Sequence, residues 1–273
     1  MLSYTLYGDF MEFMKATKND IPALKQLWQE IFKDDDGYID LFFEYKMKPE
    51  YTFVAKENNE IAGAVYSVYA PLVLDDGTEV SALYMCGICT KAEYRGRKIA
   101  STLIEECFEF AKSENIDVCY LIPANIGLFD FYEKSGFEKV SYINKVEMLG
   151  EPCKLPDFEI GFDKLLVKQY SKYDMPFKPL RTEAEFMYID RCYSAVLRFD
   201  NGYIVLDEDE KAVYLMEQTF DGTKYAKNFA HDKGKKLIVF EPADTTGTPF
   251  AVAKKINSEI KLPGWGYINL MLN

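Results

Sequence analysis

The sequence is poor in several features that would each mark a particular class of protein. It contains one histidine in 273 residues, and its 11 prolines and 16 glycines are too few for a fibrous or disordered chain. It has no run of about 18 apolar residues, and its first residues lack the basic-then-apolar order of a signal peptide. Hydrophobic residues at 48% and charged residues at 28% instead fit a folded soluble protein. We therefore expect a globular, cytoplasmic chain with no membrane partner.

Positive charge is also scarce. The 32 Lys and Arg residues are outnumbered by 44 Asp and Glu residues, so the formal net charge is −12. Proteins that bind DNA or RNA through a broad surface neutralise phosphates with Lys and Arg, so nucleic-acid partners are not expected. An acidic surface favours a cationic partner such as an amine, although the same charge also serves ordinary solubility.

The six cysteines offer one suggestive spacing, the Cys86-Gly-Ile-Cys89 pair. Residues three apart on a strand face opposite sides of a sheet, and no second C-x-x-C follows to complete a zinc or redox site. We therefore expect reduced, buried thiols and no metal ion. The single histidine, His231, stands beside Asp232 and is expected to be an exposed residue at a helix end.

Residues 88–137 combine a strand, a basic turn, an amphipathic helix, a second strand and a second helix. The turn at residues 95–100 lies where the first of these helices begins, and free N–H groups and the helix dipole suit a pyrophosphate there. Arg95, Arg97 and Lys98 add positive charge to this turn. The apolar residues that recur after it at helical spacing are Ile99, Leu103, Ile104, Cys107, Phe108 and Ala111.

The segment TKAEYRGRKIA resembles motif A of the GNAT superfamily of acetyl-CoA-dependent N-acyltransferases. The family pattern is R/Q-x-x-G-x-G/A, and Arg95 and Ala100 match its first and last positions. Lys98 replaces the middle glycine, which keeps the N–H donor but adds a side chain that must point away from the phosphates. The resemblance covers residues 12–150.

A second family pattern, N-(x)6-Y-x-x-x-G-F, lies downstream at the usual separation. It is met by Asn125, Tyr132, Gly136 and Phe137. The helix of residues 127–135 carries Tyr132, and Gly136 is then expected to be the residue just past its end.

The resemblance implies a site for acetyl-CoA as co-substrate. Its pantetheine would insert between two splayed parallel strands, residues 80–90 and 118–122, and pair with backbone groups of Ile88, Cys89 and Thr90. An N–H on that strand would hold the thioester oxygen as negative charge develops. The other residues expected to bind the cofactor are Arg95, Gly96, Arg97, Lys98, Ile99, Ala100, Ser101 and Asn125.

The resemblance also implies N-acetyltransfer by direct attack of a primary amine, small or peptide-borne, with Tyr132 as the general acid. The strand of residues 83–89 offers no Asp or Glu as a base, so water relayed through tyrosines, a carboxylate from elsewhere or the terminal carboxylate of Asn273 remain open. An alternative is a non-catalytic acyl-CoA-binding regulatory protein, and a third is transfer of a larger acyl group. The sequence names neither the acceptor nor the oligomeric state.

The implied fold class is α/β: a GNAT fold with a central, mostly antiparallel twisted sheet that is splayed at the cofactor site, plus a second, smaller α/β lobe. Prolines near residue 150 suggest a catalytic domain at residues 1–150 and a degenerate GNAT-like lobe at residues 151–273. This order resembles tandem acetyltransferases such as the mycobacterial enhanced-intracellular-survival proteins. Residues 1–10 are expected to be a dispensable extension. In the second lobe we expect helices at residues 158–173, 183–195 and 223–230, and strands at residues 202–206, 212–218, 236–241 and 265–272.

Overall fold

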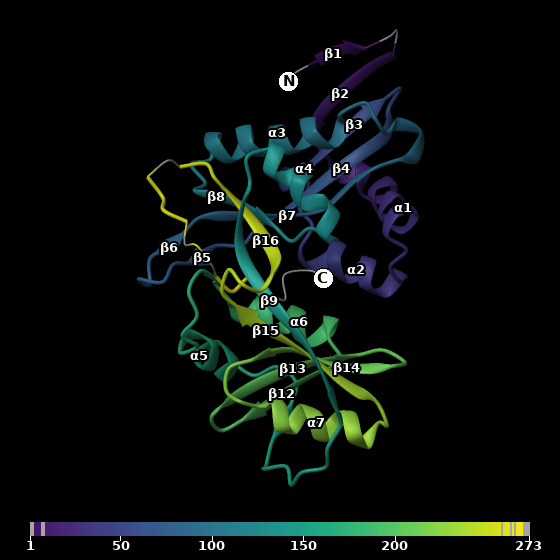
Figure 1. The fold of residues 1–273 in the computed structure, drawn as a ribbon. Helices are drawn as coiled ribbons and strands as arrows, with labels where there is room; N and C mark the ends of the chain where they lie inside the picture. The colour runs from purple at the N-terminus through teal and green to yellow at the C-terminus, as the bar shows by residue number, and fades with distance from the viewer. Residues whose placement is uncertain (1–2, 7–8, 258, 263, 265, 270–273) are drawn as a thin grey trace. The chain divides into compact units, whose positions relative to one another are not determined.

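A computed structural model of the chain describes residues 3–6, 9–257, 259–262, 264 and 266–269. The chain forms two compact units, and each unit takes segments from distant parts of the sequence (Figure 1). Unit 1 comprises Met1–Pro71, Val80–Glu138 and Val252–Leu262, and unit 2 comprises Leu72–Glu79, Lys139–Ala251 and Pro263–Asn273. This division describes how the chain packs and does not assign a function to either unit. The assignment of residues 1–150 as the catalytic domain and residues 151–273 as a second lobe concerns function and stays a proposal.

Unit 1 contains a sheet in which one strand comes from the far end of the sequence. Neighbouring strands are antiparallel except β7 and β8, which are parallel. In spatial order the strands are β1 (Ser3–Leu6), β2 (Asp9–Lys15), β3 (Thr52–Glu57), β4 (Glu60–Tyr69), β7 (Ala82–Thr90), β8 (Val118–Leu121) and the end of β16 (Thr248–Lys255). Residues 1–10 thus include a strand, and their dispensability stays a prediction.

Helices cover both faces of the unit 1 sheet (Figure 1). α3 (Ile99–Ser113) and α4 (Phe129–Lys134) share one hydrophobic cluster on one face. On the other face α1 (Ile21–Phe32) and α2 (Asp36–Tyr45) enclose Tyr66 of β4, through aromatic contacts that include Trp28. Short 3-10 turns are η1 (Lys18–Asp20), η2 (Pro49–Tyr51), η3 (Ala92–Tyr94) and η4 (Ile126–Leu128).

Unit 2 contains a second mostly antiparallel run of strands, in which β14 and β15 are the parallel pair. α7 (Thr223–Asp232) connects those two strands, and His231 is exposed near its end, as expected. The strands, in spatial order, are β9 (Glu138–Leu149), β15 (Lys236–Ala243), β14 (Ala212–Gln218), β13 (Gly202–Glu208), β12 (Ala195–Phe199) and β10 (Glu159–Ile160). A small separate sheet joins β11 (Lys178–Pro179), β5 (Leu72–Val73) and β6 (Glu79–Val80).

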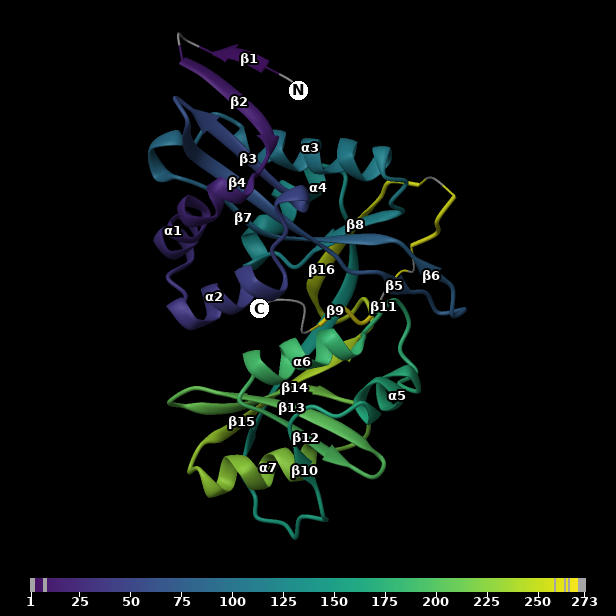
Figure 2. The ribbon, with the colours of Figure 1, turned by 180° about the vertical axis from the view of Figure 1, so that it is seen from behind.

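Strand alternation in unit 2 produces two hydrophobic clusters, and α6 and α7 lie on opposite sides of the unit 2 strands (Figure 2). On β13, Ile204 and Leu206 pack in the cluster that contains Ala226 of α7. The alternate residues Tyr203 and Val205 pack in the cluster built on α5 (Leu165–Ser171) and α6 (Glu183–Cys192). The sheet therefore has helices on both faces, and the predicted mixed α/β fold class is confirmed.

The helix expected at residues 158–173 is wrong over its first half. Residues Glu159–Ile160 form β10, which pairs with β12, and the helix begins only at Leu165. The carboxylate of Asp163 accepts a hydrogen bond from the N–H of Leu165 (2.7 Å), which favours a turn immediately before the helix.

The helix expected at residues 183–195 extends too far. α6 ends at Cys192, and Ala195 is the first residue of β12, paired with Leu206. The strand expected at residues 265–272 lies partly outside the described residues, and its described part, residues 266–269, has no regular secondary structure. The remaining expected helix and strands are confirmed with boundaries shifted by at most two residues.

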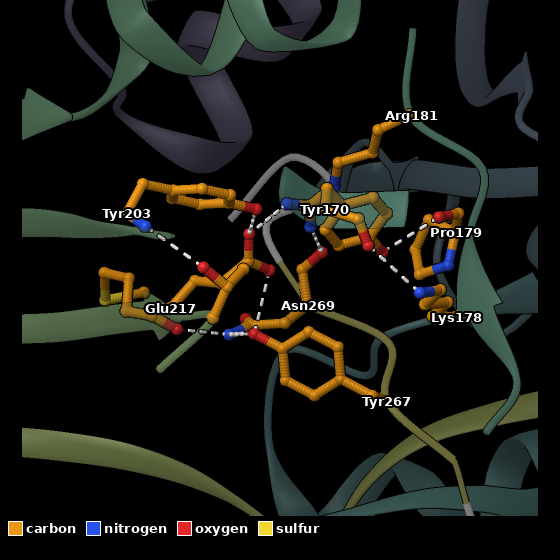
Figure 3. A network of polar contacts seen from close by, with 10 residues as sticks. Tyr170, Lys178, Pro179, Arg181, Tyr203, Glu217, Tyr267 and Asn269 are labelled. Carbon is orange, nitrogen blue, oxygen red and sulfur yellow. Dashed lines mark hydrogen bonds and ion pairs between the residues drawn. The ribbon is translucent and has the colours of Figure 1, made fainter. Parts of the chain in front are cut away.

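A buried charged cluster holds the described part of the C-terminal segment within unit 2 (Figure 3). The carboxylate of Glu217, with a fully buried side chain, pairs with Arg181 and accepts hydrogen bonds from the hydroxyls of Tyr203 (2.6 Å) and Tyr267 (2.9 Å). Arg181 in turn donates to the carbonyl of Asn269 (2.9 Å). Since a buried ion pair is stabilising only when its remaining polar atoms are satisfied, the C-terminal segment is part of what makes this cluster stable.

Candidate functional site

The two parallel strands of unit 1 separate partway along their length. β7 and β8 pair through Ala82–Val118, Leu83–Cys119 and Tyr84–Tyr120. β7 then continues to Thr90, and over the described residues its later positions pair only with β4. One edge of β7 beyond Tyr84 is therefore open to an extended ligand, as the expected splay requires.

A bulge bends β7 directly after this point. Tyr66 pairs with Cys86 and Ala64 pairs with Cys89, so two residues of β7 stand opposite one of β4. Gly87, in the bulge, has φ +54°, and a Cβ there would lie 2.6 Å from the ring of Tyr66 and 2.7 Å from that of Trp28. Glycine is thus required both by the backbone conformation and by the aromatic packing beneath it.

The bulge overturns the expectation that Cys86 and Cys89 face opposite sides of the sheet. Their partners, Tyr66 and Ala64, are two apart on β4, so both cysteines lie on the same face. Burial raises the pKa of Cys89 to about 12 and also raises that of Cys86, so both thiols stay protonated. All six cysteines are free, and the described residues contain no group of three or more His, Cys, Asp or Glu side chains that could hold a metal ion.

The turn before α3 adopts left-handed backbone conformations at two positions. Gly96 has φ +80°, and Lys98, the N-cap residue of α3, has φ +60° and ψ +19°. The carbonyl of Lys98 accepts the N–H of Thr102 (3.0 Å), while the first N–H groups of the helix remain available for an anion. Lys98 therefore adopts a conformation that the family's glycine would adopt at lower cost.

Part of the positive charge at the turn is neutralised by an ion pair that the sequence did not predict. The guanidinium of Arg97 lies 2.6 Å from a carboxylate oxygen of Glu57, whose side chain is only 8% exposed. Arg95 is exposed, and its Nε donates to the carbonyl of Thr90 at 3.4 Å. Arg95 and Lys98 thus supply charge to the turn, while the charge of Arg97 is largely balanced by Glu57.

A cavity of about 320 Å³ lies beside this turn. The hydroxyl oxygen of Thr90, in its wall, is buried without a hydrogen-bond partner in the described structure, so a bound polar group would satisfy it. Tyr94 and Phe131 also line the cavity but were not predicted as site residues. The only indication in the sequence was that they are neighbours of Arg95 and Tyr132. The lining residues are Thr90, Tyr94, Arg95, Gly96, Lys98, Ile99, Ala100, Ser101 and Phe131.

Four expected cofactor residues lie outside the cavity wall: Ile88, Cys89, Arg97 and Asn125. The side chain of Asn125 accepts the N–H of Gly127 (3.0 Å), so it caps the turn that leads into α4.

Tyr132 lies in the hydrophobic cluster between α3 and α4 and is 7% exposed. Its ring centroid is 5.1 Å from that of Phe131 and 5.8 Å from that of Phe137. Burial raises the pKa of its hydroxyl to about 12. The Tyr132 hydroxyl therefore stays protonated across the physiological range, although the cavity wall contains Phe131 rather than Tyr132 itself.

The end of α4 is a Schellman motif that fixes the backbone of Tyr132. The N–H of Phe137 donates to the carbonyl of Tyr132 (3.2 Å), and the N–H of Gly136 donates to that of Glu133 (2.9 Å). Gly136 has φ +86°, which confirms it as the residue just past the helix end.

Several solved structures share this fold. An Enterococcus faecalis protein named a probable N-acyltransferase matches with TM-score 0.70 at 11% identity, covering 90% of this chain and 72% of that one. A GCN5-related N-acetyltransferase from Anabaena variabilis gives 0.68 at 14% identity, with coverage of 90% and 73%. Eis1 from Mycobacterium abscessus gives 0.64 at 9% identity, with coverage of 91% and 74%. At these identities the likeness shows the fold, and it extends over both units.

A family model also matches part of the sequence. The GNAT acetyltransferase domain model matches residues 12–140, the segment that contains both motifs and the opening between β7 and β8. The predicted resemblance to the GNAT acetyltransferases is therefore confirmed for residues 12–140. A search of the curated proteins finds no match to the chain. Among the described residues no helix has the length and apolar content needed to cross a membrane.

Proposed function

We propose that the chain is an N-acetyltransferase that moves an acetyl group from acetyl-CoA to a primary amine. The observation that carries the proposal is the separation of β7 from β8 after Tyr84, next to the basic N-terminus of α3. An extended thioester-bearing arm fits an open strand edge, and a diphosphate fits a helix start. The match of residues 12–140 to the GNAT acetyltransferase domain model supports acyl transfer as the chemistry.

The proposed contacts follow the geometry residue by residue. Backbone groups of Ile88, Cys89 and Thr90 pair with the pantetheine along the open edge of β7, and the Thr90 hydroxyl gains a partner. The diphosphate takes N–H groups of the turn and of α3, with charge from Arg95 and Lys98. Arg97 contributes its backbone, because Glu57 holds its side chain. The residues of the turn proposed to form this diphosphate site are Arg95, Gly96, Arg97, Lys98, Ile99, Ala100 and Ser101.

Starting from a protonated amine, the proposed reaction removes two protons from nitrogen and adds one to sulfur. A lysine-like amine has a pKa near ~10.4, so it must lose a proton before its nitrogen attacks the thioester carbon. The C–N bond forms, the C–S bond breaks, and Tyr132 donates a proton to the departing sulfur. The first proton from the amine goes to water or to a carboxylate, and the second, lost as the amide forms, returns through water to the Tyr132 oxygen. Since the chain carries a net charge of −12, a cationic amine, free or on a peptide, is the proposed acceptor, and the cytoplasm is the proposed location.

Release of free thiol from acetyl-CoA across a panel of small and peptide amines tests this function. We expect turnover with at least one amine, and calorimetric binding of acetyl-CoA that is lost in Ala100→Glu, because a carboxylate at the helix start repels a diphosphate. Ala100→Gln is the matched control of similar size without charge. Tight binding without turnover of any amine would favour a non-catalytic acyl-CoA-binding protein. Equal affinity in Ala100→Glu and the parent would refute the diphosphate site.

A further inference from the structure

Lys254 of β16 reaches the end of the helix that carries Tyr132. Its backbone pairs with Cys119 of β8, so the sheet register fixes where its side chain begins. Its ammonium donates to the carbonyl of Ser135 (2.7 Å) and lies 4.0 Å from the ring centroid of Phe108. A residue 119 positions away in the sequence therefore contacts both α3 and the end of α4.

The carbonyl that Lys254 binds is one that the helix itself does not satisfy. α4 has only six residues, too few to be stable as an isolated helix. In its Schellman motif the carbonyls of Tyr132 and Glu133 accept the N–H groups of Phe137 and Gly136. The carbonyl of Ser135, the C-cap residue, lies at the negative end of the helix dipole, where an ammonium is stabilising.

Gly136 leaves the space that the ammonium occupies. A Cβ at this position would lie 3.1 Å from Nζ of Lys254, and its φ of +86° disfavours any other residue. Partial burial lowers the pKa of Lys254, so its location has a desolvation cost. The hydrogen bond to Ser135 and the cation–π contact with Phe108 offset that cost.

We propose that Lys254 is a positioning residue for Tyr132, an inference that rests on the proposed function of Tyr132 as the proton donor. Lys254 fixes the C-cap of α4 and, through Phe108, the ring of Phe137, which contacts that of Tyr132. Without the ammonium the Tyr132 hydroxyl samples more positions and donates less often in the productive one. The cofactor turn lies at the other end of α3, so acetyl-CoA binding is unaffected.

Steady-state kinetics with an amine that the enzyme acetylates distinguish a positioning role of Lys254 from a purely structural one. Lys254→Met should lower kcat about tenfold while KM for acetyl-CoA stays within about twofold, and Lys254→Arg should recover kcat to within about threefold. Lys255→Met, at the exposed neighbouring position of β16, is the control and should match the parent. In a Tyr132→Phe background, Lys254→Met should cost no more than about a further twofold. Equal losses of kcat in the two backgrounds, or a change confined to KM, would overturn the inference.

Amide hydrogen exchange tests the anchoring without any turnover, so it separates failure of this inference from failure of the proposed function. The N–H groups of Gly136 and Phe137 should exchange about tenfold faster in Lys254→Met than in Lys255→Met, with α3 unchanged. Equal protection in the two variants would overturn the inference even if the enzyme is active. If Lys254→Met does not fold, Lys254→Gln, which keeps a donor without charge, replaces it in both measurements.

Discussion

At the scale of single residues, Tyr132 provides the sharpest test of the proposed chemistry. Tyr132→Phe keeps the buried ring and removes only the hydroxyl, so folding and acetyl-CoA affinity should persist while kcat falls about 10²-fold. Because burial raises the pKa of Tyr132 to about 12, the donor stays protonated as pH rises through the range of an assay. The kcat of the parent should therefore show no alkaline loss from this residue below about pH 10. Steady-state kinetics from pH 6 to about 10 measure both effects.

Phe137→Leu is the control for disturbed packing, since its ring contacts that of Tyr132, bears no hydroxyl and lies outside the cavity wall. If Tyr132→Phe turns over an authentic substrate within about threefold of the parent, the tyrosine serves packing and another donor acts.

Lys98 is a second residue whose conformation gives a measurable prediction. Its φ of +60° is left-handed, which costs a non-glycine residue about 1–2 kcal/mol, whereas glycine adds unfolded-state entropy worth about 0.4–1 kcal/mol. Lys98→Gly should therefore raise the free energy of unfolding by about 0.5–1 kcal/mol, measured by urea denaturation. Lys98→Ala removes the same charge but keeps Cβ, and should bring no such gain. A parent more stable than Lys98→Gly would show that the lysine side chain is stabilising at this turn.

The sequence predicted those site residues whose roles depend on local chain geometry. The position of Arg95 at a helix start and of Gly136 just past a helix end follow from spacing and backbone preference. The pairing of Arg97 with Glu57 joins residues 40 apart, and no local pattern indicates it. The bulge at Gly87 likewise depends on register with β4, so the side of the sheet that Cys89 faces was predicted wrongly.

At the scale of elements, β16, the strand that pairs with β8 in unit 1, was not predicted from the sequence. β16 reads TPFAVAKK, a short run with a proline near its start, and such a run is a weak strand signal. Its strand character comes from pairing with β8, which lies more than 130 residues earlier in the sequence. Lys255, for example, pairs with Val118. Long-range pairing of this kind leaves no periodicity in the strand itself. α3, by contrast, was predicted because its apolar spacing is local.

The described residues 266–269 of unit 2 have no regular secondary structure and are held by side-chain hydrogen bonds, and Tyr267 tests this. Tyr267→Phe leaves the buried carboxylate of Glu217 with one donor fewer, so the free energy of unfolding should fall by about 1–3 kcal/mol in urea. Burial also raises the pKa of Tyr267 well above its ordinary value. The unfolded chain then loses this proton first, so stability declines above about pH 10, and Tyr267→Phe should lessen that decline.

Tyr69→Phe is the matched control, because Tyr69 is 46% exposed and lies in unit 1. The two substitutions remove the same hydroxyl group. A loss of stability no larger in Tyr267→Phe than in Tyr69→Phe would mean that the hydroxyl of Tyr267 contributes little to the cluster.

At the scale of the whole molecule, the two units repeat one motif with different chemistry. Each contains a parallel strand pair joined through a helix, β7–α3–β8 in unit 1 and β14–α7–β15 in unit 2. The strands separate partway in both pairs, after Tyr84 in unit 1 and after Leu215 in unit 2, but only the first pair has a basic turn before its helix. In unit 2 the residue before the N-cap of α7 is Asp221, where a negative charge disfavours a diphosphate. This difference supports the proposal that the catalytic function belongs to the first motif.

The return of residues 252–262 to unit 1 predicts that the proposed catalytic domain does not fold by itself. A chain ending at Gly150 lacks β16, so it loses the buried side chain of Val252, the contact of Lys254 with Ser135 and the cover on the edge of β8. An uncovered strand edge promotes aggregation. We expect this fragment to show no cooperative thermal transition and no acetyl-CoA binding by calorimetry. Joining residues 246–262 to its end through a flexible linker should restore both, whereas the same linker with a scrambled segment should not. A fragment of residues 1–150 that melts cooperatively and binds acetyl-CoA within about threefold of the parent would show that β16 is an accessory strand, and that the division at residue 150 describes an independent domain.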